Sequence, residues 1–179
     1  MDDDGIIDHI TVSASAGLDP AAVRLLAATD RLTLSSGAQV ELLLERAGGP
    51  EAADEVLRGP AHVWNSRSPY VAPARDRSSF DIRDAQRQLK HEIGKRMPSA
   101  ILAAAPEPLD DLIHAGEPLR AEHFHIVQDN GGTPPQSARP CFFRLTFEHP
   151  VDGPLAFGWG CHRGLGLFVA EGVVNVRSR

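Results

Sequence analysis

A glycine-dense stretch near residue 160 carries the residues best suited to chemistry. Residues 153–172, GPLAFGWGCHRGLGLFVAEG, hold six of the 16 glycines and place Cys161, His162 and Arg163 side by side. Imidazole titrates near neutral pH and serves as a general acid or base, and a guanidinium neutralises phosphate charge. Because glycine lets backbone N–H groups approach a ligand closely, the stretch predicts contact with a polynucleotide backbone. The structural alternative is a tight bend or bulge before a terminal strand.

The spacing of these glycines excludes two common nucleotide-binding motifs. Gly158, Gly160, Gly164 and Gly166 form G-x-G-x-x-x-G-x-G and run into a predicted strand. A dinucleotide fingerprint needs G-x-G-x-x-G at the start of a helix, and a P-loop needs a lysine after its last glycine. We therefore predict that the four glycines and Arg163 contact a polynucleotide, and we expect no cofactor.

Other candidate side chains lie elsewhere in the sequence. His9 lies on a predicted strand, either as a general base facing a cleft or as a hydrogen-bonded histidine of the sheet. Tyr70, in SRSPY, either orients a phosphate or stacks on a base, or it caps a core. His123 and His125 have a spacing that suits metal ligands, but no third ligand accompanies them, so we predict no metal site.

Positive charge is concentrated in the middle of an acidic chain. The formal net charge is −6, whereas residues 61–96 hold eight basic and four acidic side chains. An acidic total argues against generic polyanion binding, but a local basic patch still steers an anionic ligand. The alternative is an ordinary solvated helix face. Five candidate phosphate contacts lie on and just before a predicted helix in this segment: Arg75, Arg77, Arg83, Arg87 and Lys90.

Local patterns predict a β-α-β-β-α-β order before the last third of the chain. Asp19 and Pro20 are typical of a helix start, and a second helix lies within residues 78–98, with Ser79 as its cap. Its apolar stripe is Ile82, Ala85, Leu89 and Ile93. The predicted strands are residues 6–15, 38–46, 61–73 and 99–107. This order is typical of a ferredoxin-like fold.

The last third predicts a second, β-rich ferredoxin-like half. Strands are expected at residues 120–128, 140–150 and 164–171. In the second of these, alternation places Cys141, Phe143, Leu145 and Phe147 on one face. We therefore predict an α+β protein with tandem ferredoxin-like (RRM-like) folds and a C-terminal glycine-rich loop. The predicted halves are residues 1–106 and 107–179.

The composition suggests neither membrane insertion nor export. No apolar run approaches the length of about 18 residues that a membrane span needs, and no secretory signal pattern is visible. We expect a cytoplasmic protein with no membrane partner. Cys141 and Cys161 have no paired spacing, so both are expected to be free thiols.

Three segments, taken in order, resemble a known family. They are DHITVSASAGLDPAAVRLLAATDRL (8–32), GPAHVWNSRSPYVAPAR (59–75) and RPCFFRLTFEHPVDGPLAFGWGCHRGLGLF (139–168). They resemble the RAMP superfamily of CRISPR-associated proteins, specifically its sixth Cas family and the repeat-processing half of the fused subunit of type I-U (I-G) systems. The last segment carries the more specific motif. The first two segments support the resemblance mainly because they occur in the same order as in that family.

The resemblance implies a metal-independent endoribonuclease that cuts precursor CRISPR RNA within its repeats. In that family a 2′-hydroxyl attacks the adjacent phosphate and leaves a 2′,3′-cyclic phosphate and a 5′-hydroxyl. Many relatives place the catalytic histidine on the first helix, but this sequence has none between Asp19 and Arg31. The candidate catalytic residues are therefore His162, His9 and Tyr70.

Two other functions remain open at this point. One is a non-catalytic RNA-binding subunit of a type I effector complex, which would have the same fold and basic patch. The other is an unrelated small-molecule enzyme in which the glycines form only a structural bend. The partners implied by the resemblance are CRISPR repeat RNA and other subunits of the effector complex.

Overall fold

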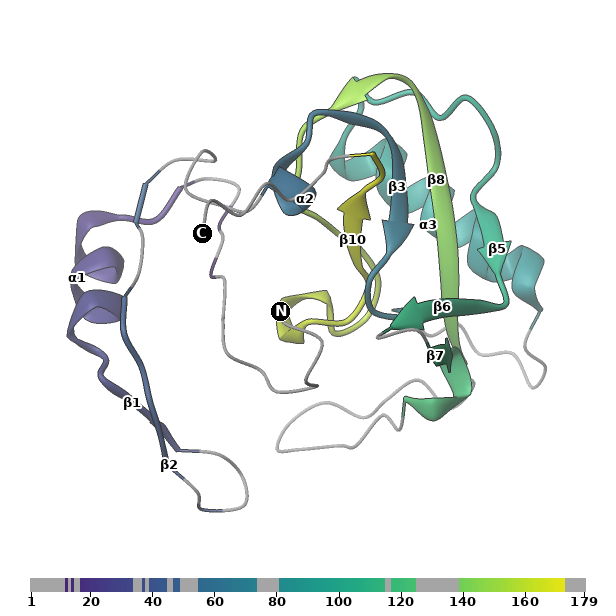
Figure 1. Cartoon of the computed structure of the whole chain (residues 1–179). Helices are drawn as coiled ribbons and strands as arrows, with labels where there is room; N and C mark the ends of the chain where they lie inside the picture. Colours follow the sequence, from purple (N-terminus) through teal and green to yellow (C-terminus); the bar gives the residue numbers. More distant parts are fainter. Residues whose placement is uncertain are drawn as a thin grey trace. The chain divides into compact units, whose positions relative to one another are not determined.

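A computed structural model describes most of the chain, in two compact units. The described residues are 12, 14, 17–33, 37, 39–44, 47–48, 55–73, 81–114, 117–124 and 139–172, with backbone only at Glu55, Val56, His114, Glu117 and Arg163. Their contacts divide the chain into a small unit, residues 7–53, and a main unit, residues 54–179 (Figure 1).

The small unit consists of one helix followed by a two-stranded hairpin. Helix α1 spans Pro20–Ala28 and begins as predicted, because the Asp19 side chain accepts the Ala22 N–H at 2.7 Å. Strands β1 (Arg31–Thr33) and β2 (Gln39–Glu41) pair antiparallel. The strand predicted at 38–46 is therefore shorter than expected, since residues 42–44 are not in a strand. The first predicted strand falls largely outside the described residues.

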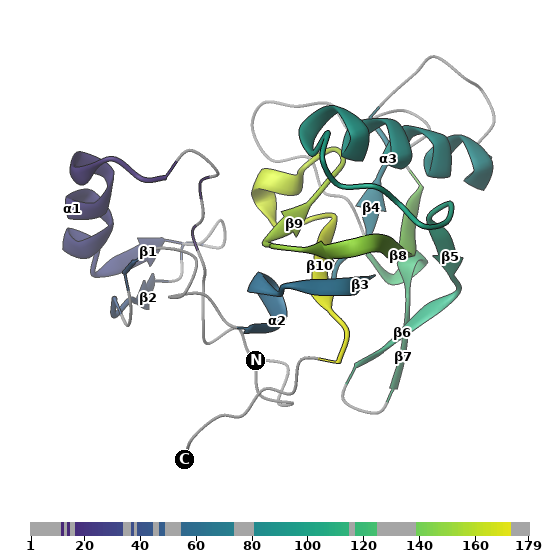
Figure 2. The ribbon, with the colours of Figure 1, turned by 90° about the horizontal axis from the view of Figure 1, so that it is seen from above.

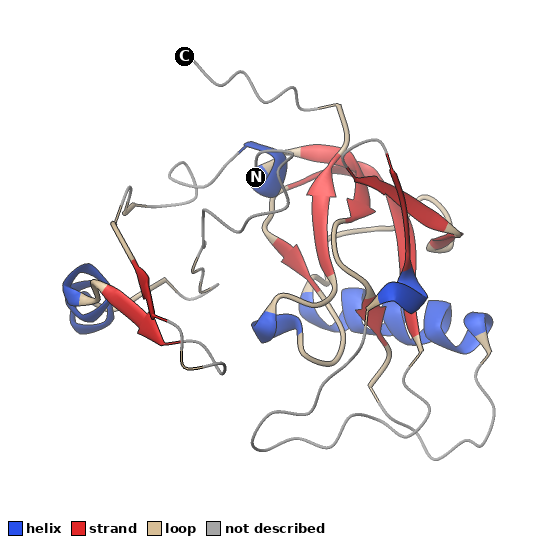
Figure 3. Cartoon of the chain, turned by 60° about the horizontal axis from the view of Figure 1, so that its bottom comes forward, coloured by secondary structure: helices blue, strands red, loops and turns tan. Residues whose placement is uncertain are grey.

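The main unit is built on a six-stranded antiparallel sheet (Figure 3). The strand order is β4-β8-β3-β10-β9, and β5 also pairs with β8. A short helix, α2 (Glu55–Arg58), precedes the sheet. The strands are β3 (Ala61–Ser66), β4 (Tyr70–Val71), β5 (Glu107–Leu109), β8 (Pro140–Val151), β9 (Leu155–Ala156) and β10 (Leu167–Ala170).

Strand β8 organises this sheet because it is long enough to pair with three other strands. Tyr70 of β4 pairs with Cys141, Leu109 of β5 with Phe142, and Trp64 of β3 with Leu145. The predicted alternation is confirmed: Cys141, Phe143, Leu145 and Phe147 are all buried in the core. Phe142, on the other face, is also buried and makes an edge-on contact with Phe124.

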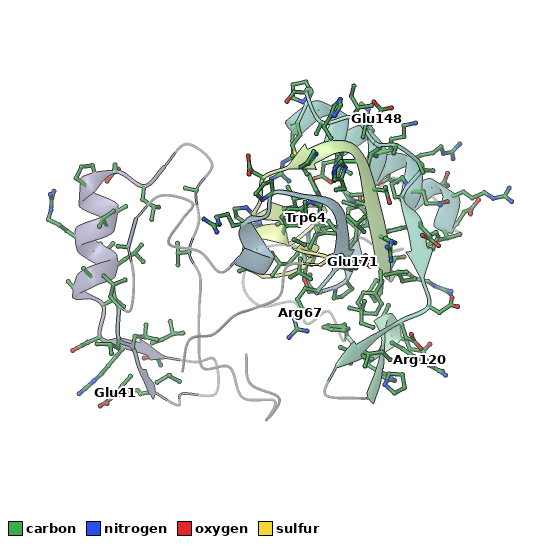
Figure 4. The ribbon with its side chains drawn as sticks, turned by 45° about the horizontal axis from the view of Figure 1, so that its top comes forward. Glu41, Trp64, Arg67, Arg120, Glu148 and Glu171 are labelled. Atoms are coloured by element: carbon green, nitrogen blue, oxygen red, sulfur yellow. The ribbon has the colours of Figure 1, made fainter. Side chains whose placement is uncertain are left out.

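Helix α3 (Ile82–Arg96) covers one face of the sheet (Figure 2). Its buried residues, Ala85, Leu89 and Ile93, lie at the predicted helical spacing and pack in one core with the inner face of β8. The Asp81 side chain caps the helix by accepting the Arg83 N–H at 2.9 Å, whereas the predicted cap, Ser79, lies outside the described residues. Trp64, inside the main unit in Figure 4, is fully buried, as a packing residue should be.

Predicted strand 61–73 is divided into β3 and β4 by residues 67–69, and two other predicted strands of the main unit also differ from the structure. Within 99–107 only Leu102 bridges to β8, at Phe147, before β5 begins at Glu107. At 120–128 the described part contains the end of β7 and a 3-10 turn, Ala121–His123, so the predicted strand is wrong there. β7 (Glu117–Arg120) instead pairs with β6 (Asp111–His114) in a separate hairpin.

The α+β class is confirmed, and the described sheets are antiparallel. The predicted tandem arrangement concerns how the strands of the two halves pair. Strand β3, from the first predicted half, pairs with β8 and β10 from the second. The two compact units meet in the sequence between residues 53 and 54, and the predicted halves, residues 1–106 and 107–179, stay a prediction.

Candidate nucleic-acid interface

The glycine-rich loop connects β9 to β10 and presents His162 to solvent. A 3-10 turn, Cys161–Arg163, forms its middle, flanked by Gly160 (φ 74°) and Gly164 (φ 86°). His162 is exposed, Cys161 is half-buried, and Arg163 is described only in its backbone. The loop therefore holds an accessible imidazole, as the sequence predicts.

The turn between β3 and β4, residues 67–69, and the end of β4 hold the loop in place. The backbone N–H of Gly166 donates to the Pro69 carbonyl at 2.8 Å, and that of Trp159 donates to the Val71 carbonyl at 2.8 Å. The Ser68 hydroxyl donates to the Gly164 carbonyl at 2.6 Å. The structure thus brings together SRSPY and the glycine-rich motif, which lie about 90 residues apart in the sequence.

Two of the glycines are required by close packing within the protein. A Cβ at Gly158 (φ 91°) would lie 2.7 Å from the Tyr70 ring, and one at Gly166 (φ 60°) would lie 1.8 Å from the Phe157 carbonyl oxygen. Neither site has room for a side chain, and both backbones lie in the left-handed region. At these two positions the structural alternative, a tight bend before a terminal strand, is sufficient to explain glycine.

Helix α3 contacts the beginning of the same loop through a charged pair. Both carboxylate oxygens of Glu92 accept the Gly158 N–H, at 3.1 and 3.0 Å, and Oε1 also pairs with Arg96 at 3.0 Å. Arg96 in turn donates to the Ala156 carbonyl at 2.8 Å, and its guanidinium carbon lies 5.2 Å from the centre of the Phe157 ring. The pair therefore joins one helix to three consecutive residues, the last of β9 and the first two of the loop.

Tyr70 lies beneath the loop, where it is fully buried. Its ring contacts Phe143 edge-on, with 5.8 Å between ring centroids, and its hydroxyl has no hydrogen-bond partner among the described atoms. Burial, and secondarily the negative charges of Glu92 and Cys141, raise the pKa of the phenol. This environment fits the packing alternative for Tyr70 better than contact with a phosphate or a base.

The solvent side of α3 is basic along its whole length. Asp84 and Glu92, the two acids of the helix, are only 20% exposed and are paired with Arg87 and Arg96. Apart from Gly94, every exposed residue of α3 is Arg, Lys or His. We call the following residues the basic face: Arg83, Arg87, Lys90, His91 and Lys95. From Arg83 to Lys95 it extends about 18 Å at 1.5 Å per residue.

The remaining predicted candidates fall into three groups. His9, Arg75 and Arg77 lie outside the described residues. Arg83, Arg87 and Lys90 lie together on α3, apart from the buried residues of that helix. Gly160, Gly164 and His162 lie at the turn of the loop.

Among the described residues, no three His, Cys, Asp or Glu side chains gather closely enough to hold a metal ion. The Nδ1 atom of His123 accepts the backbone N–H of Arg120 at 3.3 Å, while His125 lies outside the described residues.

Sequence reasoning missed Ser68, Glu92, Arg96, His91 and Lys95. The Glu92–Arg96 spacing of four residues is a recognisable helix pair, but an exposed pair of that kind ordinarily has no further partner. One more turn of the predicted stripe leads to Gly94, whereas His91 and Lys95, eight and twelve residues after Arg83, lie about 80° and 120° around the helix from Arg83, so the stripe did not include them. No local signal identified Ser68, because its partners are about 96 and 99 residues away.

We expect the two thiols to differ strongly in reactivity. Cys141 is 7% exposed, and burial raises its pKa to about 12, whereas Cys161 is half-buried in the loop. Because the thiolate is the reacting form, iodoacetamide at pH 8 should alkylate Cys141 roughly 100-fold more slowly than Cys161 in the folded protein. Mass spectrometry of peptides after timed alkylation measures both rates.

Urea provides the control for this experiment. In the unfolded chain the two rates should converge, and Cys161→Ser should remove the fast phase from the folded protein. Equal rates in the folded protein would contradict the buried position of Cys141.

No protein-family model, curated protein or solved structure matches the chain. In the part of the chain that the structure describes, none of the helices has both the length and the apolar character needed to cross a membrane.

Proposed function

We propose that this protein binds CRISPR repeat RNA and cleaves it as a metal-independent endoribonuclease. The observation that carries RNA binding is the basic face of α3, where five exposed cationic or titratable side chains follow one another along about 18 Å. Phosphate contacts supply most of the affinity for RNA, and cations carried along one rigid helix suit the regular phosphates of a nucleic-acid backbone.

His162 is the described residue best placed to take part in cleavage. Attack of the 2′-oxygen on the adjacent phosphorus breaks the bond to the 5′-oxygen. A base must accept the 2′-hydroxyl proton, and an acid must protonate the departing 5′-oxygen. An exposed imidazole at the turn of the loop meets the requirement for one of these two groups. His9 remains the proposed second group.

The second candidate is a non-catalytic RNA-binding subunit of a type I effector complex. The burial of Tyr70 favours it, because one of three proposed catalytic side chains has no access to RNA in this conformation. Binding through the basic face requires no histidine at the loop. A non-catalytic subunit would therefore bind RNA through the same residues without cleaving it.

The finer parts of the proposal concern fold and partners. We propose that the chain adopts the tandem ferredoxin-like (RRM-like) arrangement that the sequence predicts. The proposed partners are repeat RNA and other subunits of the effector complex, in the cytoplasm. An experimental structure of the protein bound to repeat RNA would test the fold and the RNA partner, and co-purification from cell extract would test the other subunits.

Incubation with end-labelled repeat RNA in excess EDTA tests the proposed function. We expect cleavage that survives chelation and gives a 2′,3′-cyclic phosphate and a 5′-hydroxyl, which polynucleotide kinase treatment identifies. Tight binding without cleavage would favour the non-catalytic subunit. Failure to bind any repeat RNA at low salt would contradict both and favour the small-molecule alternative.

Removal of two cations from the basic face should weaken RNA binding. We expect Arg83→Ala/Lys90→Ala to reduce affinity roughly tenfold and to lower the slope of log K against log salt concentration by about two, because each lost phosphate contact releases fewer counterions. Fluorescence anisotropy with labelled repeat RNA at several salt concentrations measures both quantities.

The matched control removes two exposed arginines from the small unit. Arg24→Ala/Arg31→Ala changes the net charge by the same amount, so it separates a local effect from a change in overall charge. If both double variants lowered the affinity and the slope equally, the basic face would not be the RNA-binding surface.

A further inference from the structure

The glycine-rich loop is fixed near its two ends by side chains from outside it. Glu92 of α3 holds Gly158, near the beginning, and Ser68 holds Gly164 and Leu167, near the end. We infer that Ser68 and Glu92 are positioning residues, which hold His162 at a fixed place and orientation for RNA cleavage. This inference rests on the proposed function.

Ser68 joins the two sides of the turn through one oxygen atom. Its hydroxyl donates to the Gly164 carbonyl at 2.6 Å, two residues after His162, and accepts the Leu167 N–H at 3.0 Å. The backbone N–H groups of Arg67 and Ser68 donate to the Leu167 carbonyl at 2.7 and 3.3 Å. Because a hydroxyl has one hydrogen to donate, the contact to Gly164 uses it fully. Alanine at this position would lose both side-chain bonds.

Glu92 holds the opposite side through a charged hydrogen bond. Hydrogen bonds from a backbone N–H to a carboxylate are shorter and stronger than those between neutral groups. The carboxylate is also held by Arg96, which donates to the Ala156 carbonyl. The position of Gly158 is therefore set by α3, the helix that carries the basic face, so one rigid element contacts RNA and positions the loop.

Positioning matters here because the turn itself is short. The 3-10 helix contains only three residues, and glycines with positive φ lie on both sides of it. Glycine loses more conformational freedom on ordering than any other residue, so such a turn keeps one geometry only when outside contacts hold it. A general base that moves by about 1 Å can lose roughly 100-fold in rate.

Ser68→Ala tests the inference most directly, with Ser68→Thr as the conservative variant. We expect alanine to lower kcat for repeat RNA roughly 10-fold to 100-fold with less than a twofold change in Kd, because the basic face is intact. Threonine keeps the hydroxyl and should recover most of the rate. Ser99→Ala, an exposed serine after α3, is the matched control and should cleave like wild type.

Glu92→Gln tests the other end of the loop. Glutamine keeps one acceptor oxygen but loses the ion pair with Arg96, so we expect an intermediate loss of rate. Glu148→Gln removes the charge of an exposed glutamate on β8 and serves as its control (Figure 4).

Fluorescence of Trp159 separates the inference from the proposed function. Trp64 is fully buried and Trp159 is half-buried in the loop, so acrylamide quenching reports mainly on the loop. We expect Ser68→Ala and Glu92→Gln to raise quenching, with unchanged far-UV circular dichroism. Unchanged quenching, or raised quenching with wild-type kcat, would overturn the inference. A wild type that fails to cleave RNA would count against the proposed function, and the quenching data alone would then decide whether these residues fix the loop.

Discussion

Replacement of His162 by alanine is expected to lower the rate of repeat RNA cleavage by about 10²-fold to 10⁴-fold, the usual contribution of a general acid or base. His162 is exposed at the turn of the loop, so its removal disturbs no core residue and leaves the basic face of α3 intact. Affinity for RNA should therefore change by less than about threefold. Single-turnover cleavage in EDTA, together with anisotropy measurements of Kd, separates the two effects.

A second exposed histidine provides the control for this prediction. His149 lies on β8, outside the glycine-rich loop, and His149→Ala should cleave like wild type. The pH dependence of the single-turnover rate should also lose one of its two limbs in His162→Ala, because one titrating group is gone. Wild-type cleavage by His162→Ala, with loss in His9→Ala, would assign the chemistry to His9 alone.

The two helices with caps and the longest strand were the parts most accessible to sequence reasoning. Asp19 with Pro20 marks the start of α1, and the stripe Ala85, Leu89 and Ile93 marks the buried side of α3. Alternation along β8 identified its buried side in the same way. All three signals are local, because they depend on a period of 3.6 or 2 residues within one element.

The pairing of strands could not be predicted from the sequence, because each strand pairs with a partner far away in the chain. β3 pairs with β8 about 80 residues later, and β10 lies between β3 and β9. Segment 120–128 shows the same limit: its alternating residues predict a strand, but Ala121–His123 form a 3-10 turn that ends with Phe124 packed on Phe142. Tertiary contacts override weak local preferences in short segments.

The sequence predicted which residues lie in the glycine-rich loop, but not which distant residues contact it. The glycine pattern indicated a bend with an accessible imidazole, and the structure places His162 at that bend. The glycine pattern did not indicate that Tyr70 would pack under Gly158 or that Glu92 would accept the Gly158 N–H. Both contacts come from segments that are distant in the sequence, and neither residue type at its position carries a local signal for such a role.

Gly166→Ala is expected to be the most destabilising of the glycine substitutions in this loop. The added Cβ would lie 1.8 Å from the Phe157 carbonyl oxygen, and the backbone at φ 60° disfavours any L-residue. Left-handed backbone costs about 1–2 kcal/mol and forced backbone shifts cost about 1–3 kcal/mol more, so we expect a loss of about 3–4 kcal/mol in the free energy of unfolding. Urea unfolding followed by tryptophan fluorescence measures this difference.

Gly164→Ala is the matched control, because it separates backbone strain from steric overlap. Gly164 also has positive φ, 86°, but a Cβ there would meet no atom within 4 Å. Its cost should therefore be limited to about 1–2 kcal/mol of backbone strain. A larger loss at Gly164 than at Gly166 would contradict the packing of Gly166 against Phe157. Weaker RNA binding by Gly164→Ala with only a slight fall in stability would place the approach of the loop to the phosphate backbone at Gly164, because among the four glycines of the loop a Cβ meets no atom within 4 Å only there.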